Sequence, residues 1–341
     1  MERREPSVYK LIPAGKNYLW GGHRLQAEFG KNFAMDPVAE TWECSTHPDG
    51  MSLVGESCCA EGAVCSLQDL LLTYPAYLGT HPAQSMPEAA AGGKIPILVK
   101  FIDAAQDLSV QVHPDDVYAR EQENGQLGKT EMWYVLDAAP GAQLIYGFRR
   151  DMTRETVLHA LTSDRLESVL QRIPVRKDDV FYVQAGTVHA IGAGCLIAEV
   201  QESSNLTYRL YDYHRKDPDG RERDLHIDKA LDVMQYRAST APRQPMRVLR
   251  YRPGCASELL CRCRYFEVHR LLINTRILSD PLTYRTDSSS FHTLICIEGC
   301  GVISCTDGEE LPIFRGDSLF VPADTTGILI RGTAVFLDIN C

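Results

Sequence analysis

The segment KDDVFYVQAGTVH, residues 177–189, combines a tight turn, a β-rich run that ends in valine, and a second turn before a histidine. RGDSLFVPAD at residues 315–324 has a similar pattern. EMWYVLD at 131–137 likewise lines up with HTLICIE at 292–298. Two pairs of similar segments in the same order predict two related β-sandwich units in tandem.

Further short β-rich runs are spread along the chain, and 25 glycines and 18 prolines provide turns between them. They include residues 97–102, 132–136, 180–183 and 293–297. Short strands at this density favour a sandwich or barrel. No G-x-G-x-x-G motif follows a strand and no P-loop occurs, which argues against a doubly wound nucleotide-binding sheet. We therefore expect a mainly β protein.

Helical patterns are few and are expected to be insertions packed on the β structure. Residues 66–78 begin with Ser66 as a candidate N-cap and contain clustered leucines. Residues 151–171 predict one or two amphipathic helices, and residues 228–236 predict a shorter one. The stripe expected to be buried in the second segment consists of Leu158, Leu161, Leu166 and Leu170.

The repeat and the insertions together divide the chain into two domains. We predict a catalytic N-terminal domain over residues 1–240, with helical insertions near 60–90 and 150–172. A C-terminal domain is predicted over residues 241–341. In the alignment of the two units His189 falls opposite Gly327. The C-terminal domain is therefore expected to lack a complete ligand set and to serve as a structural or interaction unit.

The composition limits the possible partners. The 341 residues include 35 Lys and Arg and 45 Asp and Glu, which gives a formal charge of −10. A general nucleic-acid binder would need a basic footprint. No run approaches the ~18–20 apolar residues of a membrane span, and the opening residues MERREP lack the apolar core of a secretory signal. We expect a cytoplasmic protein that binds neither nucleic acid nor membrane.

The 12 cysteines do not follow a zinc-binding pattern. Cys58 and Cys59 are adjacent, Cys261 and Cys263 are two apart, and no C-x-x-C pair occurs. Without a secretory signal, reduced thiols that pack as small hydrophobic side chains are the expected state.

Alternation in LSVQVHP, residues 108–114, places three polar side chains on one face of a strand. These are Ser109, Gln111 and His113. Glu131 opens the next predicted strand, and His189 follows the Ala-Gly-Thr turn. Two imidazoles, a carboxylate and an amide oxygen suit Zn²⁺ or another divalent ion. The alternative is that both histidines are ordinary core or surface residues.

Arg209 lies in LTYRLYDY, residues 206–213, where alternation puts Thr207, Arg209 and Tyr211 on one face. A guanidinium pointing inward would bind phosphate or an oxyanion through its fork of donors. The structural alternative is a surface arginine that forms an ion pair with a nearby carboxylate.

For three more charged residues, a functional and a purely structural interpretation both remain open. Glu199 stands in an otherwise apolar run, where a carboxylate is either paired or functional. Lysines such as Lys100 and Lys129 are usually solvated. Lys129 precedes Glu131 by two residues, so the two side chains should share one side if the strand begins early.

Several longer motifs occur in one order along the chain, and together they identify a family. They are residues 17–22 (NYLWGG), 39–48 (AETWECSTHP), 98–104 (LVKFIDA), 108–116, 128–134 (GKTEMWY), 185–194 and 199–213. With these motifs the sequence resembles type I mannose-6-phosphate isomerases (phosphomannose isomerases), especially their shorter bacterial forms. The resemblance is dense from about residue 9 to 236 and loose in the C-terminal unit.

The resemblance implies a cupin (jelly-roll) fold in tandem units with a helical insertion, and one zinc ion per chain. The implied zinc ligands are Gln111, His113, Glu131 and His189. The implied essential arginine is Arg209, and lysines implicated in catalysis or substrate binding map onto Lys100 and Lys129. The implied acid/base carboxylate and substrate-site serine are Glu199 and Ser109.

Three positions depart from the family pattern. Asn205 replaces an aspartate that often precedes the arginine by four residues, and it cannot accept a proton in the same way. Gln184 replaces the proline of a P-A-G turn, and Gly128 stands where longer members often carry histidine. The residues that would open the sugar ring are therefore the least certain to carry over.

The implied reaction is the interconversion of mannose 6-phosphate and fructose 6-phosphate through a cis-enediol, with Lys129 and Ser109 holding the phosphate. The expected partner is a small sugar phosphate, and the expected assembly is a monomer or homodimer. Two alternatives come from other classes. Two histidines and a carboxylate also describe the iron(II) site of a cupin oxygenase. The chain could instead be a non-catalytic sugar-phosphate-binding protein.

Overall fold

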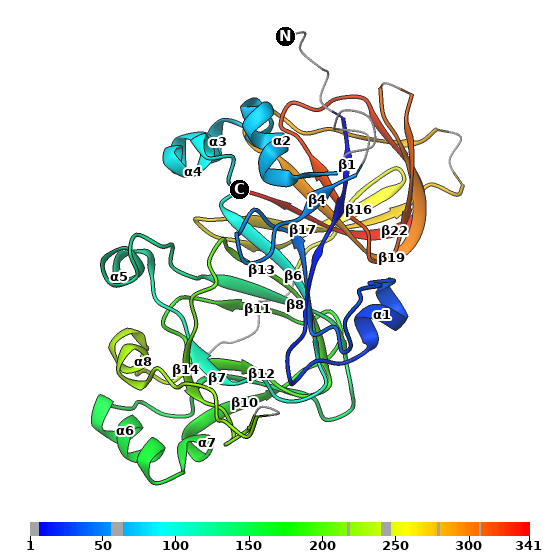
Figure 1. The fold of residues 1–341 in the computed structure, drawn as a ribbon. Coiled ribbons are helices and arrows are strands. Elements are labelled where there is room, and N and C mark those ends of the chain that lie inside the picture. The colour runs from blue at the N-terminus through cyan, green and yellow to red at the C-terminus, as the bar shows by residue number, and fades with distance from the viewer. Residues whose placement is uncertain (1–6, 56–63, 217–218, 240–246, 278–279, 307) are drawn as a thin grey trace.

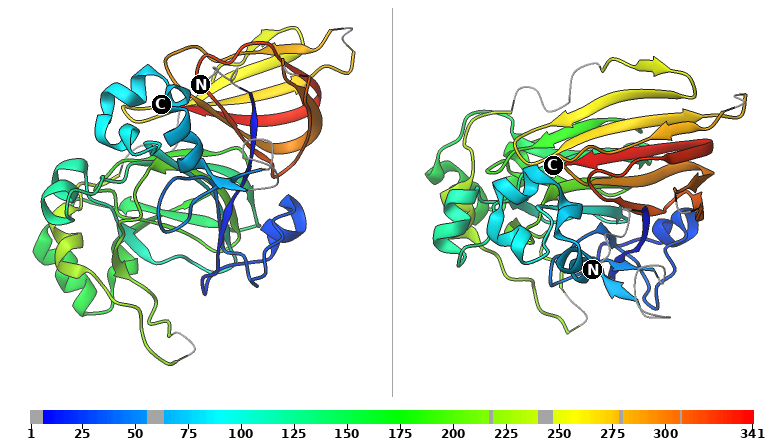
Figure 2. Two further views of the ribbon diagram at one scale, coloured as in Figure 1. Left: turned by 45° about the horizontal axis from the view of Figure 1, so that its top comes forward. Right: turned by 90° about the horizontal axis from the view of Figure 1, so that it is seen from above.

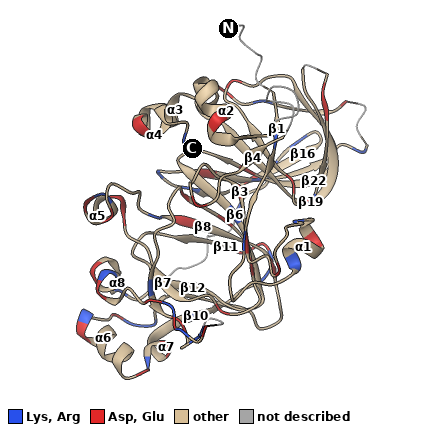
Figure 3. Cartoon of the chain, viewed as in Figure 1, with Lys and Arg blue, Asp and Glu red and all other residues tan. Residues whose placement is uncertain are grey.

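The protein consists of two β units, one above the other, with short helices around them (Figure 1). The computed structural model describes residues 7–55, 64–216, 219–239, 247–277, 280–306 and 308–341. Strands dominate over helices in this part of the chain, so the prediction of a mainly β fold is confirmed. Acidic and basic residues are interspersed over both units, without a large basic stripe in the described part (Figure 3).

The N-terminal unit contains two antiparallel sheets. The larger one has the order β11 (Val180–Val183), β8 (Glu131–Ala138), β13 (Cys195–Glu202), β6 (Ile97–Ala104), β3 (Glu40–Cys44) and β2 (Ala14–Lys16). The smaller one has the order β10 (Leu170–Pro174), β9 (Gln143–Phe148), β12 (His189–Ile191), β7 (Val110–Val112) and β14 (Tyr208–Tyr211). The candidate site residues come from both sheets.

The C-terminal unit is built on one large sheet, whose yellow, orange and red strands form a curved layer in Figure 2. Its order is β15 (Arg250–Arg252), β16 (Cys255–Arg262), β17 (Glu267–Asn274), β22 (Ile328–Asn340), β19 (His292–Ser304), β21 (Ser318–Val321), β1 (Tyr9–Ile12), β4 (Leu53–Val54) and β5 (Cys65–Ser66). Two further strands pair alongside this path, namely β18 (Leu282–Tyr284) with β22 and β20 (Glu310–Phe314) with β19.

The predicted internal repeat is present in the strand pairing. Strands β6-β13-β8-β11 of the first unit have the same order as β17-β22-β19-β21 of the second. The register also matches, because Glu131 faces Val183 in one unit and His292 faces Val321 in the other. The second unit therefore holds His292 where the first holds Glu131.

The polar residues at this place in the second unit satisfy one another. His292 Nδ1 lies 2.6 Å from Asp338 Oδ1, and the hydroxyl of Tyr284 lies within 3.1 Å of both side chains. His189 begins β12 in the first unit, and the aligned residue in the second unit is Gly327, directly before β22. A glycine at this position supplies no imidazole. Within the described residues, three histidine, cysteine or acidic ligands come together only in the first unit.

Alternation along β8 explains why the two units pack together. Met132, Tyr134 and Leu136 point into a core shared with the C-terminal unit, whereas Trp133 and Val135 point between the two sheets of the first unit. Strands with apolar residues on both faces are typical of the middle layer of a domain. The larger sheet is therefore buried on both sides.

The helices lie on the outside of the β structure (Figure 1). In the described residues they are α1 (Arg24–Phe29), α2 (Leu67–Thr73), the 3₁₀-helix η2 (Pro75–Leu78), α3 (Thr80–Ser85), α4 (Pro87–Ala91), α5 (Asp116–Gln122), α6 (Arg154–Thr162), α7 (Leu166–Val169) and α8 (Ile227–Val233). The predicted cap of α2 is confirmed, because the Ser66 side chain accepts a hydrogen bond from the backbone N–H of Asp69.

The predicted leucine stripe is only partly correct. Leu166 and Leu170 are buried, but Leu158 is 42% exposed. Val157 and Ala160 form the buried face of α6 instead. A turn with a left-handed residue follows this helix and the chain enters β10 soon afterwards, so one helical period does not extend over the whole segment.

The N-terminal segment supplies strands to the sheet of the C-terminal unit. Strand β1 pairs with β21, and β4 and β5 continue that sheet, so the N-terminal segment completes the C-terminal unit. The predicted boundary at residue 240 lies outside the described residues and stays a prediction, as does the part of the first helical insertion before residue 64.

The ten cysteines of the described residues are free thiols, and Cys58 and Cys59 lie outside that part of the chain. None of the described helices has the length and apolar character needed to cross a bilayer.

A buried ion pair of the N-terminal unit is hydrogen-bonded to the C-terminal unit. The ammonium of Lys31 lies 2.6 Å from a carboxylate oxygen of Glu43 on β3, and it also donates to the carbonyl oxygen of Gly316. The Ser318 hydroxyl on β21 donates to the same carboxylate. Glu43 is 0% exposed, so its charge depends on these contacts.

We therefore predict that Glu43→Ala destabilises the protein by about 3–5 kcal/mol, because the buried Lys31 ammonium loses its counter-charge. Urea denaturation measures the loss. The matched control is Asp232→Asn, which breaks an exposed pair with Arg154 and should cost about 0–1 kcal/mol. Equal losses in the two variants would show that the pair does not hold the units together.

Candidate functional site

A cavity of about 290 Å³ opens between the two sheets of the N-terminal unit. Its wall is more polar than a sandwich core, and it collects residues that are far apart in the sequence. The lining residues are Tyr18, Trp20, Glu40, Lys100, Ile102, Leu108, Ser109, Gln111, Lys129, Ile191, Glu199, Asn205, Thr207, Arg209 and Arg223.

The smaller sheet supplies a row of three side chains. Gln111 on β7 faces His189 on β12 on one side and Arg209 on β14 on the other. Residues directly opposite each other in a sheet project to the same face, so this row points into the site. Ser109 and Thr207 line the same cavity, as their alternation predicted.

Tyr211 does not share this face, so that part of the prediction is wrong. The pairing of β14 with β7 shifts after Arg209, and Tyr211 then faces Val110 rather than a residue of the site row. Val110 points into the core beneath α6 and α8, and Tyr211 packs there. A bulge of this kind turns the following side chains to the other face.

The larger sheet supplies a second row opposite the first. Glu199 on β13 faces Lys100 on β6 and Trp133 on β8. Glu131 begins β8, two residues before Trp133, and so projects to the same side. The indole N–H of Trp133 donates to Glu199 Oε2 at 2.9 Å, which fixes the orientation of this carboxylate.

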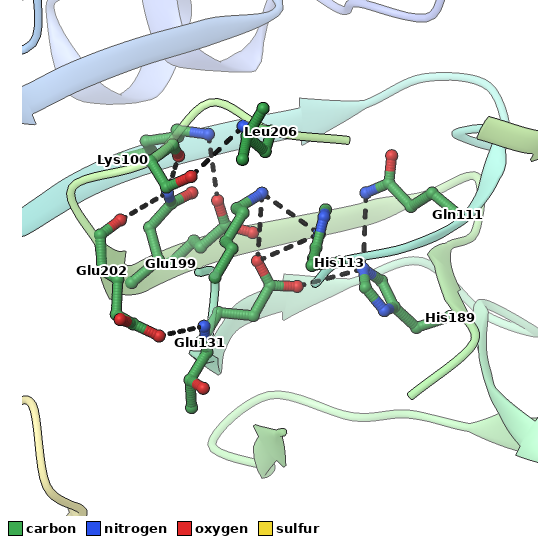
Figure 4. A network of polar contacts seen from close by, with 12 residues as sticks. Lys100, Gln111, His113, Glu131, His189, Glu199, Glu202 and Leu206 are labelled. Atoms are coloured by element: carbon green, nitrogen blue, oxygen red, sulfur yellow. Dashed lines mark hydrogen bonds and ion pairs between the residues drawn. The ribbon is translucent and has the colours of Figure 1, made fainter. Parts of the chain in front are cut away.

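His113, Glu131 and His189 form a compact cluster in which the candidate ligand atoms lie within 4.8 Å of one another. Figure 4 shows both imidazoles pointing toward the carboxylate of Glu131. His189 Nε2 lies 3.1 Å from Glu131 Oε1, and His113 Nε2 lies 3.7 Å from Oε2. The amide nitrogen of Gln111 is 3.4 Å from His189 Nε2. The structure thus brings together all four predicted metal ligands.

The cluster contains lone pairs that require a cation. His189 Nδ1 lies 2.8 Å from the carbonyl oxygen of Thr187, to which it donates. In a neutral imidazole this leaves the lone pair of Nε2 facing Glu131 Oε1. Neither buried oxygen of Glu131 has a hydrogen-bond donor of good geometry among the described residues. A divalent ion would satisfy these atoms, so the donor set fits a metal.

Lys129 adds a positive charge beside this cluster. Its ammonium is 3.2 Å from Glu131 Oε2 and 3.2 Å from His113 Nε2. Burial and the Lys129 charge hold the pKa of His113 well below its usual value, so the imidazole is neutral and able to bind a metal. Burial alone would raise the pKa of Glu131, but its neighbours, with the charge of Lys129 foremost, outweigh burial and the pKa lies well below its usual value.

Lys100 and Glu199 form a second charged group in the cavity. Lys100 Nζ lies 3.2 Å from Glu199 Oε1 and 3.9 Å from Glu40 Oε2. Burial lowers the pKa of Lys100, but the two carboxylates outweigh it and raise the pKa. Burial and the charge of Glu131 raise the pKa of Glu199. Lys100 is therefore a persistent cation, whereas the raised pKa of Glu199 makes its protonated form more accessible than in a free carboxylic acid.

Arg209 is not the surface arginine of the structural alternative. It lines the cavity, and its Nη1 atom donates to the carbonyl oxygen of Asp224, at 2.8 Å. The nearby carboxylate of Asp212 pairs with Arg215 and Arg223 instead. The guanidinium is therefore available to a ligand.

Sequence reasoning missed several lining residues, among them Glu40, Tyr18 and Arg223. Glu40 precedes Trp42 by two residues on a buried strand, so the two side chains share one face. A carboxylate at this spacing in a buried strand could have indicated Glu40. Arg223 lies between β14 and α8, outside any regular element, so no periodicity marks it. Burial raises the pKa of Tyr18 to about 12, so its hydroxyl keeps its proton.

The structure also accounts for two departures from the family pattern. A Cβ atom at Gly128 would lie 2.5 Å from the backbone nitrogen of Asp116, so a histidine does not fit at this position of the backbone. Asn205 lines the cavity, and its amide donates to Asp49 Oδ2 at 2.8 Å. A carboxamide keeps a polar contact there without supplying a base.

Comparison with protein families gives two matches. The family model for the catalytic domain of type I phosphomannose isomerase matches residues 8–136. The model for the cupin domain of mannose-6-phosphate isomerase matches residues 258–339. The predicted cupin architecture is thereby confirmed.

Individual relatives extend the match over nearly the whole chain. The mannose-6-phosphate isomerase ManA of Bacillus subtilis is 38% identical over 334 residues, which is 97% of each chain. The crystal structure of a mannose 6-phosphate isomerase from the same organism is 31% identical, covers 98% of this chain and 99% of its own, and superposes with a TM-score of 0.85. A zinc-bound mannose 6-phosphate isomerase shares the fold at 18% identity, with a TM-score of 0.72 and coverage of 98% and 99%.

These matches cover both sheets of the cavity, the four candidate metal ligands and the C-terminal unit. The chain therefore belongs to the type I phosphomannose isomerase family and is a mannose-6-phosphate isomerase by descent.

Proposed function

We propose that the chain interconverts mannose 6-phosphate and fructose 6-phosphate at this cavity, with one bound zinc ion and a cis-enediol intermediate. The observation that carries the proposal is the buried cluster of His113, Glu131 and His189, which adjoins the cavity through Gln111 and Lys129. Glu199, Lys100 and Arg209 line that cavity. Isomerisation needs a group that moves a proton between C1 and C2 and positive charge near the oxygens of the enediolate. Both are present.

Zinc is the metal that the donor set and the family favour. Imidazole nitrogens, a carboxylate and an amide oxygen would come from Gln111, His113, Glu131 and His189, and the amide of Gln111 needs only to turn over to present its oxygen. Zinc is also the metal of the isomerase that shares this fold at 18% identity. When bound, it would supply Lewis-acid stabilisation of negative charge on the sugar oxygens.

Glu199 is the residue that we assign to proton transfer. Its Oε1 atom is buried without a hydrogen-bond partner of good geometry among the described residues, while Oε2 is fixed by Trp133. A raised pKa suits a carboxylate that must accept and return a proton. Lys100 is 3.2 Å from Oε1, and as a persistent cation it would favour the ionised form of Glu199.

Arg209 would stabilise the negative charge that develops on the sugar oxygens. It faces Gln111 across the strand pair, one strand beyond the metal ligands. Ser109 lines the cavity and remains the predicted phosphate contact with Lys129. The ammonium of Lys129 lies beside Glu131 and His113, so it also contributes charge at the metal cluster.

The oxygenase alternative is the weaker one. An open iron(II) site uses two histidines and one carboxylate and leaves the other positions to oxygen and co-substrate. Here Gln111 stands 3.4 Å from His189 as a fourth donor, and four cationic side chains line the cavity. This arrangement suits an anionic substrate.

The first test is a coupled assay for fructose 6-phosphate formed from mannose 6-phosphate. We expect turnover that a chelator abolishes and that added Zn²⁺ restores, because the lone pairs of the cluster need a cation. A protein that binds one zinc ion per chain and does not convert mannose 6-phosphate would refute the substrate assignment.

The second prediction separates the metal site from the catalytic arginine. His113→Ala should lose bound zinc and turnover together, because one of the two imidazole ligands is removed. Arg209→Ala should keep its zinc and lose about 10²–10³-fold in kcat. Metal analysis and steady-state kinetics measure both effects. The exposed His214 provides the matched control, and His214→Ala should retain its zinc. Arg209→Ala with wild-type turnover would contradict the assigned role.

The third prediction distinguishes Glu199 from Lys100 as the proton-transfer group. Glu199→Gln should keep zinc and lose about 10²–10⁴-fold in kcat, because an amide cannot accept the proton. Exchange of the substrate C2 proton with solvent deuterium, followed by NMR, should fall in parallel. Glu202→Gln is the control, since Glu202 is a buried carboxyl of the same strand that binds the Thr130 N–H and does not line the cavity. Proton exchange that survives in Glu199→Gln and is lost in Lys100→Gln would reverse the assignment.

A further inference from the structure

The cationic side chains of the cavity fall into two groups. Lys100 and Lys129 each lie 3.2 Å from a buried carboxylate, so their charges are largely neutralised within the protein. Arg209 and Arg223 form the second group. Arg209 has no carboxylate partner among the described residues, and Arg223 shares its carboxylate with Arg215, so this group keeps capacity for an anion.

Arg209 lacks a carboxylate partner of its own. Its Nη1 atom donates to a backbone carbonyl, and its buried Nε has no hydrogen-bond partner among the described residues. Arg209 and Arg223 line the same cavity, and burial together with the charge of Arg223 lowers the pKa of Arg209. Two arginines held together at one wall create a local positive potential despite the acidic total charge.

Arg223 is held in place by a carboxylate that it shares. Its Nε and Nη2 atoms donate to the two oxygens of Asp212, at 2.8 and 2.5 Å. The same carboxylate also accepts from Arg215, so one negative charge serves two guanidiniums. The Arg223 side chain is 25% exposed, and Asp212 engages only one edge of its fork. The Nη1 atom of Arg223 takes no part in this ion pair, so it can donate to a ligand.

The position of the arginines suits the far end of a sugar phosphate. Arg209 is separated from His189 by one intervening strand, which corresponds to about 10 Å across two strand spacings. In an open-chain hexose 6-phosphate the phosphate is at the opposite end from the reacting carbons C1 and C2. A substrate with C1 and C2 at the metal cluster and its sugar oxygens beside Arg209 would therefore extend its phosphate past Arg209 toward Arg223.

We propose that Arg223 binds the phosphate group of the substrate and that Asp212 is the positioning residue that holds its guanidinium at the cavity wall. This inference rests on the proposed function, because it takes the substrate to be a sugar phosphate. It places the phosphate away from Lys129, whose ammonium lies 3.2 Å from Glu131 at the metal cluster. Guanidinium is suited to this role because its fork of donors matches phosphate oxygens.

The test is calorimetric titration of the zinc-loaded protein with inorganic phosphate, alongside steady-state kinetics with mannose 6-phosphate. Arg223→Gln should weaken phosphate binding and raise KM by about 10- to 100-fold, the loss expected for one charge-assisted contact. We expect kcat and zinc content to stay near the wild-type values, because the contact lies away from the reacting carbons. Arg223→Lys, which keeps the charge but loses the fork, should give a smaller loss.

Arg215→Gln is the matched control. Arg215 pairs with the same carboxylate, but it does not line the cavity, so its loss perturbs the local packing without removing a ligand contact. Phosphate affinity should remain near wild type in this variant. Equal weakening in Arg215→Gln and Arg223→Gln would overturn the inference, because it would show an indirect effect through Asp212. Wild-type phosphate affinity and KM in Arg223→Gln would also overturn it.

The titration also separates this inference from the proposed function. A wild-type protein that binds phosphate through Arg223 but does not isomerise mannose 6-phosphate would leave the anion site standing and refute the reaction. If the wild-type protein isomerises mannose 6-phosphate and Arg223→Gln has an unchanged KM, the reaction is established and the phosphate contact of Arg223 is refuted.

Discussion

The buried carboxylate of Glu131 is the constraint on which the site depends. It is 0% exposed at the first position of β8, and a carboxylate there is too costly to keep without positive charge around it. The ammonium of Lys129 supplies part of that charge. The lone pair of His189 faces the same carboxylate, so the arrangement is complete only with a cation between them. The candidate metal site thus arises where this carboxylate is buried between two imidazoles.

The two-sheet architecture holds the ligands of this site in register. Gln111 and His189 come from adjacent strands of the smaller sheet, and Glu131 and Glu199 come from neighbouring strands of the larger one. The C-terminal unit packs against the back of the larger sheet through apolar residues that alternate with the site residues. It also contributes Ser318 to the buried charge network around Glu43. Its described residues contain no cluster of three candidate metal ligands, but this unit supports the larger sheet, from which Glu131 and Glu199 project.

Charge is distributed unevenly within the cavity. The two lysines are paired with carboxylates near the reacting centre, whereas the two arginines lie one strand further away with a single shared carboxylate between Arg223 and Arg215. Under the roles proposed above, the lysine–carboxylate pairs belong to the region for proton transfer and Arg223 to the region for anion binding. The formal charge of −10 has little influence on either, because the local field in a low-dielectric cavity outweighs the distant surface charges.

The sequence by itself determined the β-rich repeat and the row of Ser109, Gln111 and His113, because strand alternation is a local property of the backbone. It could not determine that Tyr211 leaves its predicted face, because a shift in pairing between two strands sets that orientation. Nor could it place Arg223, which no periodicity marks and which reaches the cavity only through Asp212. Local geometry repeats along the chain and can be read there, whereas bulges and shared ion pairs arise from contacts between distant segments. Only the tertiary structure decides these contacts.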